Sequence, residues 1–403
     1  MKIGLVTGEY PPMEGGVGAF TQELAKALHA LGHEVHIITD VAARVKPAER
    51  ADTIRESWQR INALREPFEL PFASVHPRGS SWRWGNMSII ADIAIRYDLD
   101  LVNVQYQAAA YNMRSAAINF LPWRLRGIVP CVVTFHDLRV PYLWPKAGPI
   151  RPFVVRRLAQ KAAGVIVTND SDEADAQSFG VTALKNIPIG SNIPVYEPNP
   201  MERQEWTEQL SLPENGVSLA YFGFLNESKG GDTLIQSMIE LGKKYHLTFI
   251  GGRTGASDSA NNQLFFQQID QLIDAYQLES RVHWTGFMSD RRVSTALHMA
   301  DLVVLPYKDG VSLRRGTLMA ALAHGCAIIS TEPERPVPQL IHGENIWLIP
   351  PDDPQALAAA VRHLQKRPEL RTKLGVAAQK TGELFGWGSI SEETARFYDQ
   401  VVV

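Results

Sequence analysis

Cysteine is nearly absent from the chain: 403 residues contain two, Cys131 and Cys326. They lie far apart, each beside an apolar, β-like run. Disulfide frameworks and structural zinc sites both need clustered cysteines, so neither is expected here. We predict two buried free thiols, which is usual in a reducing compartment.

The sequence also lacks long apolar runs and an excess of charge of one sign. No stretch reaches the ~20 apolar residues of a membrane span, and the chain starts in a strand-like run without a charged-then-apolar leader. The 40 Lys and Arg residues nearly balance the 43 Asp and Glu residues, a formal net charge of -3 that gives no general attraction to nucleic acid. These absences predict a soluble, cytoplasmic protein that binds no nucleic acid.

Short β-branched runs alternate with amphipathic segments in the first half of the chain. The pattern predicts strands at residues 2–7, 34–39, 101–105, 129–135 and 165–168, and helices at 16–31, 87–97, 112–126, 152–163 and 172–179. Strands that are apolar almost throughout, alternating with helices, are typical of a parallel sheet covered on both faces.

The second half repeats this alternation. Strands are expected at residues 217–222, 247–251, 282–286, 302–306, 327–331 and 346–349, and helices near 231–241, 264–276, 291–298, 317–323 and 354–365. The stretch 191–215 is rich in Pro and Asn and reads as a linker and domain start. We therefore predict an α/β protein of two doubly wound domains, residues 1–190 and 216–385, with ligands bound in the cleft at the carboxyl ends of the strands.

A glycine cluster, Gly15, Gly16 and Gly18, separates the first strand from the first helix. Clustered glycines cost conformational entropy, so they need a reason. One is a tight turn; the other is that bare amides at a helix start face a phosphate or a sugar hydroxyl. The spacing is not G-x-G-x-x-G, which argues against a dinucleotide fingerprint.

Two further segments place polar residues after expected strands. His136 and Asp137 follow a buried strand, where the histidine would point into the cleft or only cap a loop. Lys229 precedes Gly230 and Gly231 at a helix start, where a lysine and free amides suit an anion, although a solvated lysine is the simpler alternative.

The strongest local signal is the loop before the helix expected at 317–323. It places Ser312, Arg314, Arg315 and Thr317 together. Cations are disfavoured at the positive end of a helix, and an anionic ligand between two guanidinium forks would offset that cost. The alternative is a solvated basic loop. No residues group into a metal-ligand pattern.

Together, these segments resemble the retaining glycosyltransferases of the GT-B fold, specifically the family 4 group. The resemblance spans nearly the whole chain and is carried by the order and spacing of "PPMEGGVGAFTQELAKALHALGHEVHIIT", "TFHD", "YFGFLNESKGGDTLIQSM", "ALAHGCAIIST" and "NIWLIPPDDPQALAAAV". It implies two Rossmann-like domains, an acceptor-side domain at 1–190 and a donor domain at 216–385, facing an inter-domain cleft. It also implies that 386–403 form a helix crossing back to the N-terminal domain.

The resemblance implies a reaction and roles for particular residues. A sugar passes from a nucleoside diphosphate sugar to an acceptor hydroxyl with retention of configuration, without a metal or another cofactor. The acceptor would be a glycan, a lipid-linked molecule or a small molecule. His136 and Lys229 are implied in catalysis and Asp137 on the acceptor side. Donor phosphate binding is implied for Gly15, Gly16, Lys229, Ser312, Arg314, Arg315, Gly316 and Thr317.

The chain departs from the family at positions that matter. Ser312 and Ala320 stand where the family carries two glutamates eight residues apart, and Phe224 replaces an arginine that precedes Lys229 by five residues. An acid often found after the next strand is Gln339 here. We hypothesise that Arg314 and Arg315 supply the positive charge that Phe224 lacks.

Other interpretations remain at this stage. The missing glutamates are compatible with a non-catalytic relative that binds a nucleotide sugar or a partner subunit. An epimerase of the same fold would need cleft carboxylates, and a nicotinamide dehydrogenase would need the glycine fingerprint; the sequence shows neither. Arg151, Arg156, Arg157 and Lys161 lie on one expected helix, where peripheral membrane contact is conceivable but a solvated face is the favoured interpretation.

Overall fold

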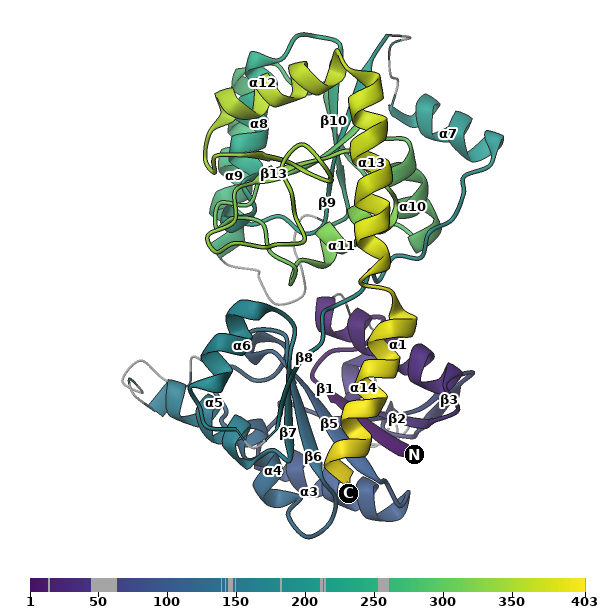
Figure 1. The fold of residues 1–403 in the computed structure, drawn as a ribbon, viewed down its shortest axis with the longest axis vertical. Coiled ribbons are helices and arrows are strands. Elements are labelled where there is room, and N and C mark those ends of the chain that lie inside the picture. The colour runs from purple at the N-terminus through teal and green to yellow at the C-terminus, as the bar shows by residue number, and fades with distance from the viewer. Residues whose placement is uncertain are drawn as a thin grey trace, which may run out of the picture. The chain divides into compact units, whose positions relative to one another are not determined.

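The computed structural model describes residues 1–13, 15–44, 64–138, 140–141, 143, 148, 150–181, 183–210, 213, 215–252 and 261–402. The chain forms two compact units (Figure 1): Met1–Ile189 together with Trp387–Val403, and Gly190–Gly386. Each unit is built on one predominantly parallel sheet with helices, which confirms the predicted α/β class.

The first unit contains an eight-stranded sheet of order β3-β4-β2-β1-β5-β6-β7-β8. Its strands are β1 (Lys2–Thr7), β2 (Glu34–Asp40), β3 (Phe68–Leu70), β4 (Ala73–Gly79), β5 (Leu101–Tyr106), β6 (Cys131–Phe135), β7 (Gly164–Val167) and β8 (Leu184–Asn186). All pairs are parallel except β3 with β4. Strands β5, β6 and β7 are buried at every position, as strands covered on both faces must be.

The helices of the first unit include the last one of the chain. They are α1 (Gly16–Ala30), α3 (Trp84–Arg96), α4 (Leu121–Arg124), α5 (Ile150–Lys161), α6 (Asp170–Gln177) and α14 (Trp387–Val402), with short 3-10 turns η1 (Val41–Arg44), η2 (Ala108–Ala110) and η3 (Ala117–Phe120). Helix α14 packs against α1 (Figure 1). The amide of Asn103 in β5 also donates to the hydroxyl of Tyr398 at 2.5 Å, which anchors α14 in the core of this unit.

The second unit contains a six-stranded parallel sheet of order β11-β10-β9-β12-β13-β14. Its strands are β9 (Val217–Phe222), β10 (Tyr245–Ile250), β11 (Val282–Trp284), β12 (Leu302–Leu305), β13 (Ile328–Thr331) and β14 (Trp347–Ile349). Its helices are α7 (Pro200–Leu210), α8 (Gly231–Glu240), α9 (Asn261–Ala275), α10 (Asp290–His298), α11 (Gly316–Ala323), α12 (Pro354–Gln365) and α13 (Pro368–Glu383), with the 3-10 turn η4 (Glu227–Lys229).

The helix predicted at residues 112–126 is wrong. This segment forms the 3-10 turn η3 followed by the single-turn helix α4, with Pro122 at its start. A proline is tolerated in the first turn of a helix, but it disrupts the interior of a longer helix. Strands β3, β4 and β8 and helix α13 were not predicted.

The predicted linker at 191–215 contains helix α7. The helix starts with a reciprocal cap: the Asn199 side chain accepts from the amide of Glu202 at 3.0 Å, and the Glu202 carboxylate accepts from the amide of Asn199 at 2.9 Å. Such a cap satisfies two amides that a helix start leaves unpaired. The stretch 191–215 is rich in Pro and Asn and was therefore interpreted as a loop, although one of these residues, Asn199, caps a helix.

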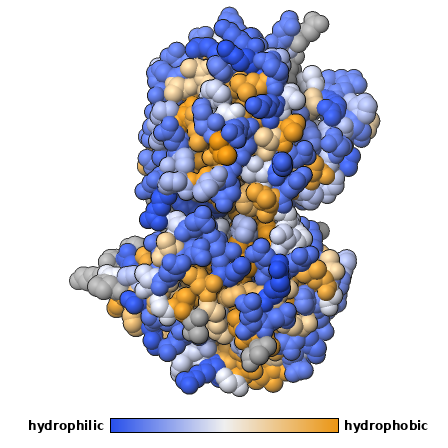
Figure 2. All heavy atoms as spheres, in the orientation of Figure 1, coloured by the Kyte–Doolittle hydropathy of each residue, from blue (hydrophilic) through white to orange (hydrophobic). Residues whose placement is uncertain are grey.

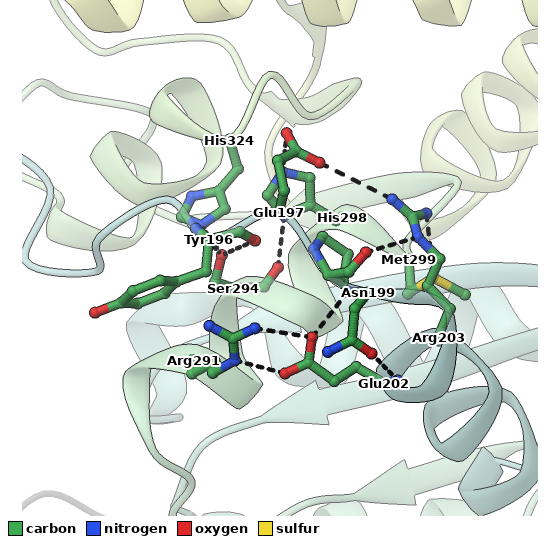
Figure 3. Close-up of polar contacts among 11 residues, drawn as sticks. Tyr196, Glu197, Asn199, Glu202, Arg203, Arg291, Ser294, His298, Met299 and His324 are labelled. Atoms are coloured by element: carbon green, nitrogen blue, oxygen red, sulfur yellow. Dashed lines mark hydrogen bonds and ion pairs between the residues drawn. The ribbon is translucent and has the colours of Figure 1, made fainter.

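This segment is also fixed to helix α10 (Figure 3). Glu202 pairs with Arg291, whose Nε lies 2.5 Å from Oε1. The backbone of Tyr196 bonds the Ser294 hydroxyl twice, through its amide at 2.9 Å and its carbonyl at 3.1 Å. Ser294 in turn lies 2.9 Å from Nε2 of His324. Residues 196–202 are thus part of the second unit and not a free connection.

Cys131 and Cys326 are both buried and free, as predicted. On the face drawn in Figure 2, hydrophilic residues cover much of both units and apolar residues appear in smaller patches among them. Among the helices of the described residues, none has the length and apolar character needed to cross a membrane.

Candidate active site

In the first unit, the loop after β1 carries a buried carboxylate that the sequence analysis missed. Glu9 is 9% exposed. Its Oε1 accepts from the amides of Val17 at 2.9 Å and Gly18 at 3.3 Å, at the start of α1. Burial raises the pKa of Glu9, although these two amide bonds lower it in part. The chain therefore supplies its own carboxyl oxygen to the amides in the first turn of α1.

The glycines of this loop make room for Glu9. A Cβ at Gly15 would lie 2.1 Å from Oε1 of Glu9, and one at Gly18 would lie 2.8 Å from the Glu9 carbonyl oxygen. A Cβ at Gly16 would meet nothing within 4 Å. The steric need for glycine is thus explained at Gly15 by the Glu9 carboxylate and at Gly18 by the Glu9 backbone carbonyl. A donor-binding role of Gly15 and Gly16 stays a prediction. The sequence signal for the cap is an acid, Glu9, six residues before the glycine cluster.

His136 lies at the end of β6, beside the end of β5. Its Nε2 is 3.0 Å from Oε1 of Gln105, and its ring packs edge-on against Phe20 of α1 at 4.7 Å between centroids. Burial lowers the pKa of His136 to about 3, so the imidazole is neutral at physiological pH. Because the Gln105 oxygen can only accept, the proton is assigned to Nε2, which leaves Nδ1 as an acceptor.

Asp137, predicted on the acceptor side, is 8% exposed and accepts from the Gln107 amide at 3.0 Å. His136 and Asp137 are therefore both held by glutamines at or just after the end of β5. The structure brings His136 beside α1, whose first turn holds Glu9, so the predicted residues of the first unit share the carboxyl edge of its sheet.

In the second unit, three predicted residues converge on Tyr307, which sequence reasoning missed. Tyr307 follows β12 and is fully buried. Lys229 Nζ lies 5.3 Å and Arg315 Cζ 4.7 Å from the centre of its ring, both within cation–π range. The Tyr307 hydroxyl is 2.5 Å from Oγ1 of Thr317.

Arg314 and Arg315 share an acidic partner that was not predicted. Nη2 of Arg315 donates to both carboxylate oxygens of Asp309, at 2.5 Å to Oδ2, and Nη2 of Arg314 lies 3.7 Å from Oδ2. Asp309 therefore neutralises part of the positive charge of Arg314 and Arg315, which we expected an external anion to neutralise. Two guanidinium groups against one carboxylate still leave one positive charge at the start of α11.

Ser312 and Ala320 occupy different environments. The Ser312 hydroxyl oxygen and Nε of Arg315 are buried and have no hydrogen-bond partner within the described structure. Ala320 is fully buried inside α11. Within the described residues, Ser312 thus adds a hydroxyl without a hydrogen-bond partner to the loop, whereas Ala320 packs inside the core. Gly316 is the first residue of α11, directly after the cap residue Arg315.

A close backbone contact fixes the segment of Lys229 beside β12. Gly230 has φ +68, and a Cβ there would lie 1.9 Å from the carbonyl oxygen of Pro306. The amide of Lys308 also donates to the carbonyl of Ser228 at 3.0 Å. Only glycine fits this approach, which places Lys229 over the Tyr307 ring.

In the parts of the chain that the structure describes, no three His, Cys, Asp or Glu side chains come together as metal ligands. The positive groups at the edge of the second sheet are side chains and a helix start. Such groups can stabilise a phosphate or diphosphate without rearranging.

Comparison with known proteins identifies the class. Residues 14–192 match the model of Glycosyltransferase Family 4, and residues 202–381 match that of Glycosyl transferases group 1. D-inositol 3-phosphate glycosyltransferase of Corynebacterium aurimucosum is 22% identical over 99% of this chain and 96% of that protein.

Two solved structures show the same fold. Sucrose-phosphate synthase of Thermosynechococcus elongatus has a TM-score of 0.76 and 21% identity, covering 99% of this chain and 98% of that chain. HepE of Anabaena in complex with UDP-glucose has a TM-score of 0.73 and 18% identity, covering 99% and 100%. The architecture is therefore that of the GT-B glycosyltransferases. The chain belongs to the family 4 group of these enzymes, as its motifs predicted.

Proposed function

We propose that this glycosyltransferase uses a nucleoside diphosphate sugar as donor and transfers the sugar with retention of configuration, without a metal ion in the transfer step. The observation that carries the proposal is the positive cluster around Tyr307: Lys229 and Arg315 on its ring, and Arg314 beside them at the start of α11. Two similar proteins support the substrate class: HepE was solved with UDP-glucose, and the Corynebacterium relative is named for transfer to an inositol phosphate.

The proposed work of this cluster is electrostatic. As the bond between sugar and diphosphate breaks, negative charge builds on the leaving phosphate, and donors fixed beforehand stabilise that charge without reorganising. Arg315 is held by Asp309 and by the ring of Tyr307, so its guanidinium is already oriented. Its buried Nε and the Ser312 hydroxyl are the unused polar atoms through which the loop would contact the donor.

The two missing glutamates change how the donor would be held. Ser312 would offer the sugar a neutral hydroxyl where the family has a carboxylate, and Ala320 would make no contact with the ribose. We expect this enzyme to bind its donor mainly through the diphosphate. Discrimination among nucleoside bases would then rest on other residues of the second unit.

His136 and Asp137 would act in the first unit. A neutral His136 offers Nδ1 as a hydrogen-bond acceptor to a sugar hydroxyl, and it cannot serve as a general acid because its pKa is about 3. The acceptor would be a glycan, a lipid-linked molecule or a small molecule.

Titration calorimetry with UDP, GDP, ADP and dTDP, each in EDTA, tests the proposal. We expect one nucleoside diphosphate to bind and the same affinity after Mg²⁺ is added. If the folded protein bound none of the four nucleotides, the proposed class of donor would be overturned. With the matching nucleotide sugar, proton NMR of the glycoside formed reads the anomeric configuration, and an inverted product would overturn retention.

A further inference from the structure

A pocket with a volume of about 120 Å³ opens in the first unit between β4 and α3. His76 and Arg78 line it from β4, Asp92 and Arg96 from α3, and Tyr97 from the residue after that helix; the other lining side chains are apolar. Helix α3 starts just after β4 ends and runs back along it, so Arg96 and Tyr97 lie away from the carboxyl edge of the sheet. The pocket is therefore separate from the glycine loop and His136.

Among the described residues, the two arginine side chains of the pocket have no acidic partner. There, the side chains of Arg78, Arg96 and Asp92 make no hydrogen bond or ion pair. Two guanidinium groups and one carboxylate leave the pocket positive. Arginine is the side chain best suited to planar, two-point contact with an oxyanion.

His76 ends a hydrogen-bond chain that comes from β2. Oε1 of Glu34 lies 2.9 Å from Nε2 of His36, and Nδ1 of His36 lies 3.1 Å from Nε2 of His76. The carboxylate can only accept, so Nε2 of His36 carries a proton. With that proton on Nε2, His36 offers Nδ1 as the acceptor for Nε2 of His76 at 3.1 Å. This series of hydrogen bonds leaves Nδ1 of His76 without a proton, so that it can act as an acceptor.

The surroundings keep His76 neutral. The groups that face it are His36 and Glu34 from β2, Arg78 from β4, and Asp92, Arg96 and Tyr97 from α3 and its end. Burial, then the neighbouring His36, Arg78 and Arg96, lower the pKa of His76 to about 4. The pocket therefore combines two arginine side chains with one histidine acceptor.

We propose that this pocket is a second ligand site, for hydrogen phosphate. Arg78 and Arg96 would donate to its charged oxygens, and its P–OH would donate to Nδ1 of His76. Sulfate has the same shape and charge but no proton to donate, so it leaves the acceptor unpaired. The site discriminates phosphate from sulfate, and it is independent of the transfer reaction.

Calorimetry with inorganic phosphate at pH 7.5 tests the site in the whole protein. The R314Q/R315Q variant removes phosphate binding at the start of α11, so binding that persists in it is assigned elsewhere. We expect R78Q/R96Q to weaken this remaining binding at least about tenfold. R124Q/R126Q, which removes two arginines of the same unit outside the pocket, should leave it unchanged. No phosphate binding in R314Q/R315Q, or binding unaffected by R78Q/R96Q, would overturn the proposal.

Selectivity tests the acceptor. Phosphate should bind at least about tenfold more tightly than sulfate, because a buried polar atom left unpaired is costly. Glu34→Gln is the second variant: Glu34 is exposed, and a glutamine amide can donate to Nε2 of His36, which lets the chain reverse and Nδ1 of His76 become a donor. We expect E34Q to bind the two anions within about threefold of each other. Equal binding of sulfate and phosphate by the wild type would refute the assignment to hydrogen phosphate.

Discussion

The guanidinium carbon of Arg315 lies 4.7 Å from the centre of the buried Tyr307 ring, whose hydroxyl contacts Thr317. Burial raises the pKa of Tyr307 to about 12, although the charge of Arg315 lowers it in part. The phenol therefore stays neutral and serves as a support. Arg315 is fixed between this ring and Asp309, which is the preorganisation that binding of a leaving diphosphate requires.

Removing both arginines tests that arrangement. The R314A/R315A variant should lose at least about 100-fold in affinity for the nucleoside diphosphate, because two charge-assisted contacts disappear. Calorimetry gives the affinity. K373A/K380A, which removes two exposed charges from α13 of the same unit, is the matched control and should bind normally. Unchanged affinity in R314A/R315A would show that these arginines do not replace the charge missing at Phe224.

The glycine loop offers a paired test of the Glu9 cap. Gly15→Ala places a methyl group 2.1 Å from the Glu9 carboxylate and should lower the free energy of unfolding by about 1–2 kcal/mol, since the cap of α1 is displaced. Gly16→Ala meets open space and should change it by less than about 0.5 kcal/mol. Urea denaturation measures both. Equal effects would mean that the cap contributes little.

Acid should destabilise the protein between about pH 6.5 and pH 4. The pKa values of His76 and His324 are lowered to about 4 and that of His136 to about 3, mainly by burial. Below the unfolded value of about 6.5 the unfolded chain binds more protons, so the free energy of unfolding falls as pH falls. Each histidine adds up to about 1.4 kcal/mol per pH unit to this fall.

A variant pair isolates one of these histidines. His76→Gln should flatten the dependence of unfolding free energy on pH between 6.5 and 4, and His29→Gln, at an exposed position of α1, should not. Urea midpoints at pH 7 and pH 5 decide this. A slope that H76Q leaves intact would contradict the assigned contribution of His76.

The contact of Tyr398 with Asn103 should contribute to the stability of the first unit. Tyr398→Phe removes a buried hydrogen bond and should cost about 1 kcal/mol, and not more, because Asn103 keeps the Thr134 hydroxyl as a partner at 3.0 Å. Tyr276→Phe, at an exposed tyrosine, is the control and should be neutral within about 0.5 kcal/mol. A neutral Y398F would place the anchor of α14 in its apolar contacts alone.

Regular, strongly apolar elements were predictable from the sequence. The expected bounds of β1 and β9 match the structure, and α1 differs by one residue, because continuous apolar runs and a clear helical period leave few alternatives. Strand β4, "ASVHPRG", was missed because its Pro77 and polar residues hide a buried strand whose pairing is decided by β2. Helix α7 was missed because its polar sequence depends on a cap and on docking to α10.

The sequence predicted where several residues of the candidate site lie, but not which side chains they contact. Motif order located Lys229, His136 and Arg315 correctly at strand ends and a helix start. Glu9, Tyr307 and Asp309 were missed, because their importance lies in which side chain each one meets. Asp309 precedes Arg315 by six residues, yet the loop between them folds back so that the two meet, and no periodicity in the sequence predicts that.

The bond between Asn103 and Tyr398 joins residues 295 positions apart, and it has a consequence for the order of synthesis. Domains commonly fold one after another as the chain emerges, the N-terminal one first. Here the second unit, Gly190–Gly386, is continuous and can close as soon as it is made. The first unit must wait for Trp387–Val403, so the half of the protein that is translated first is completed last.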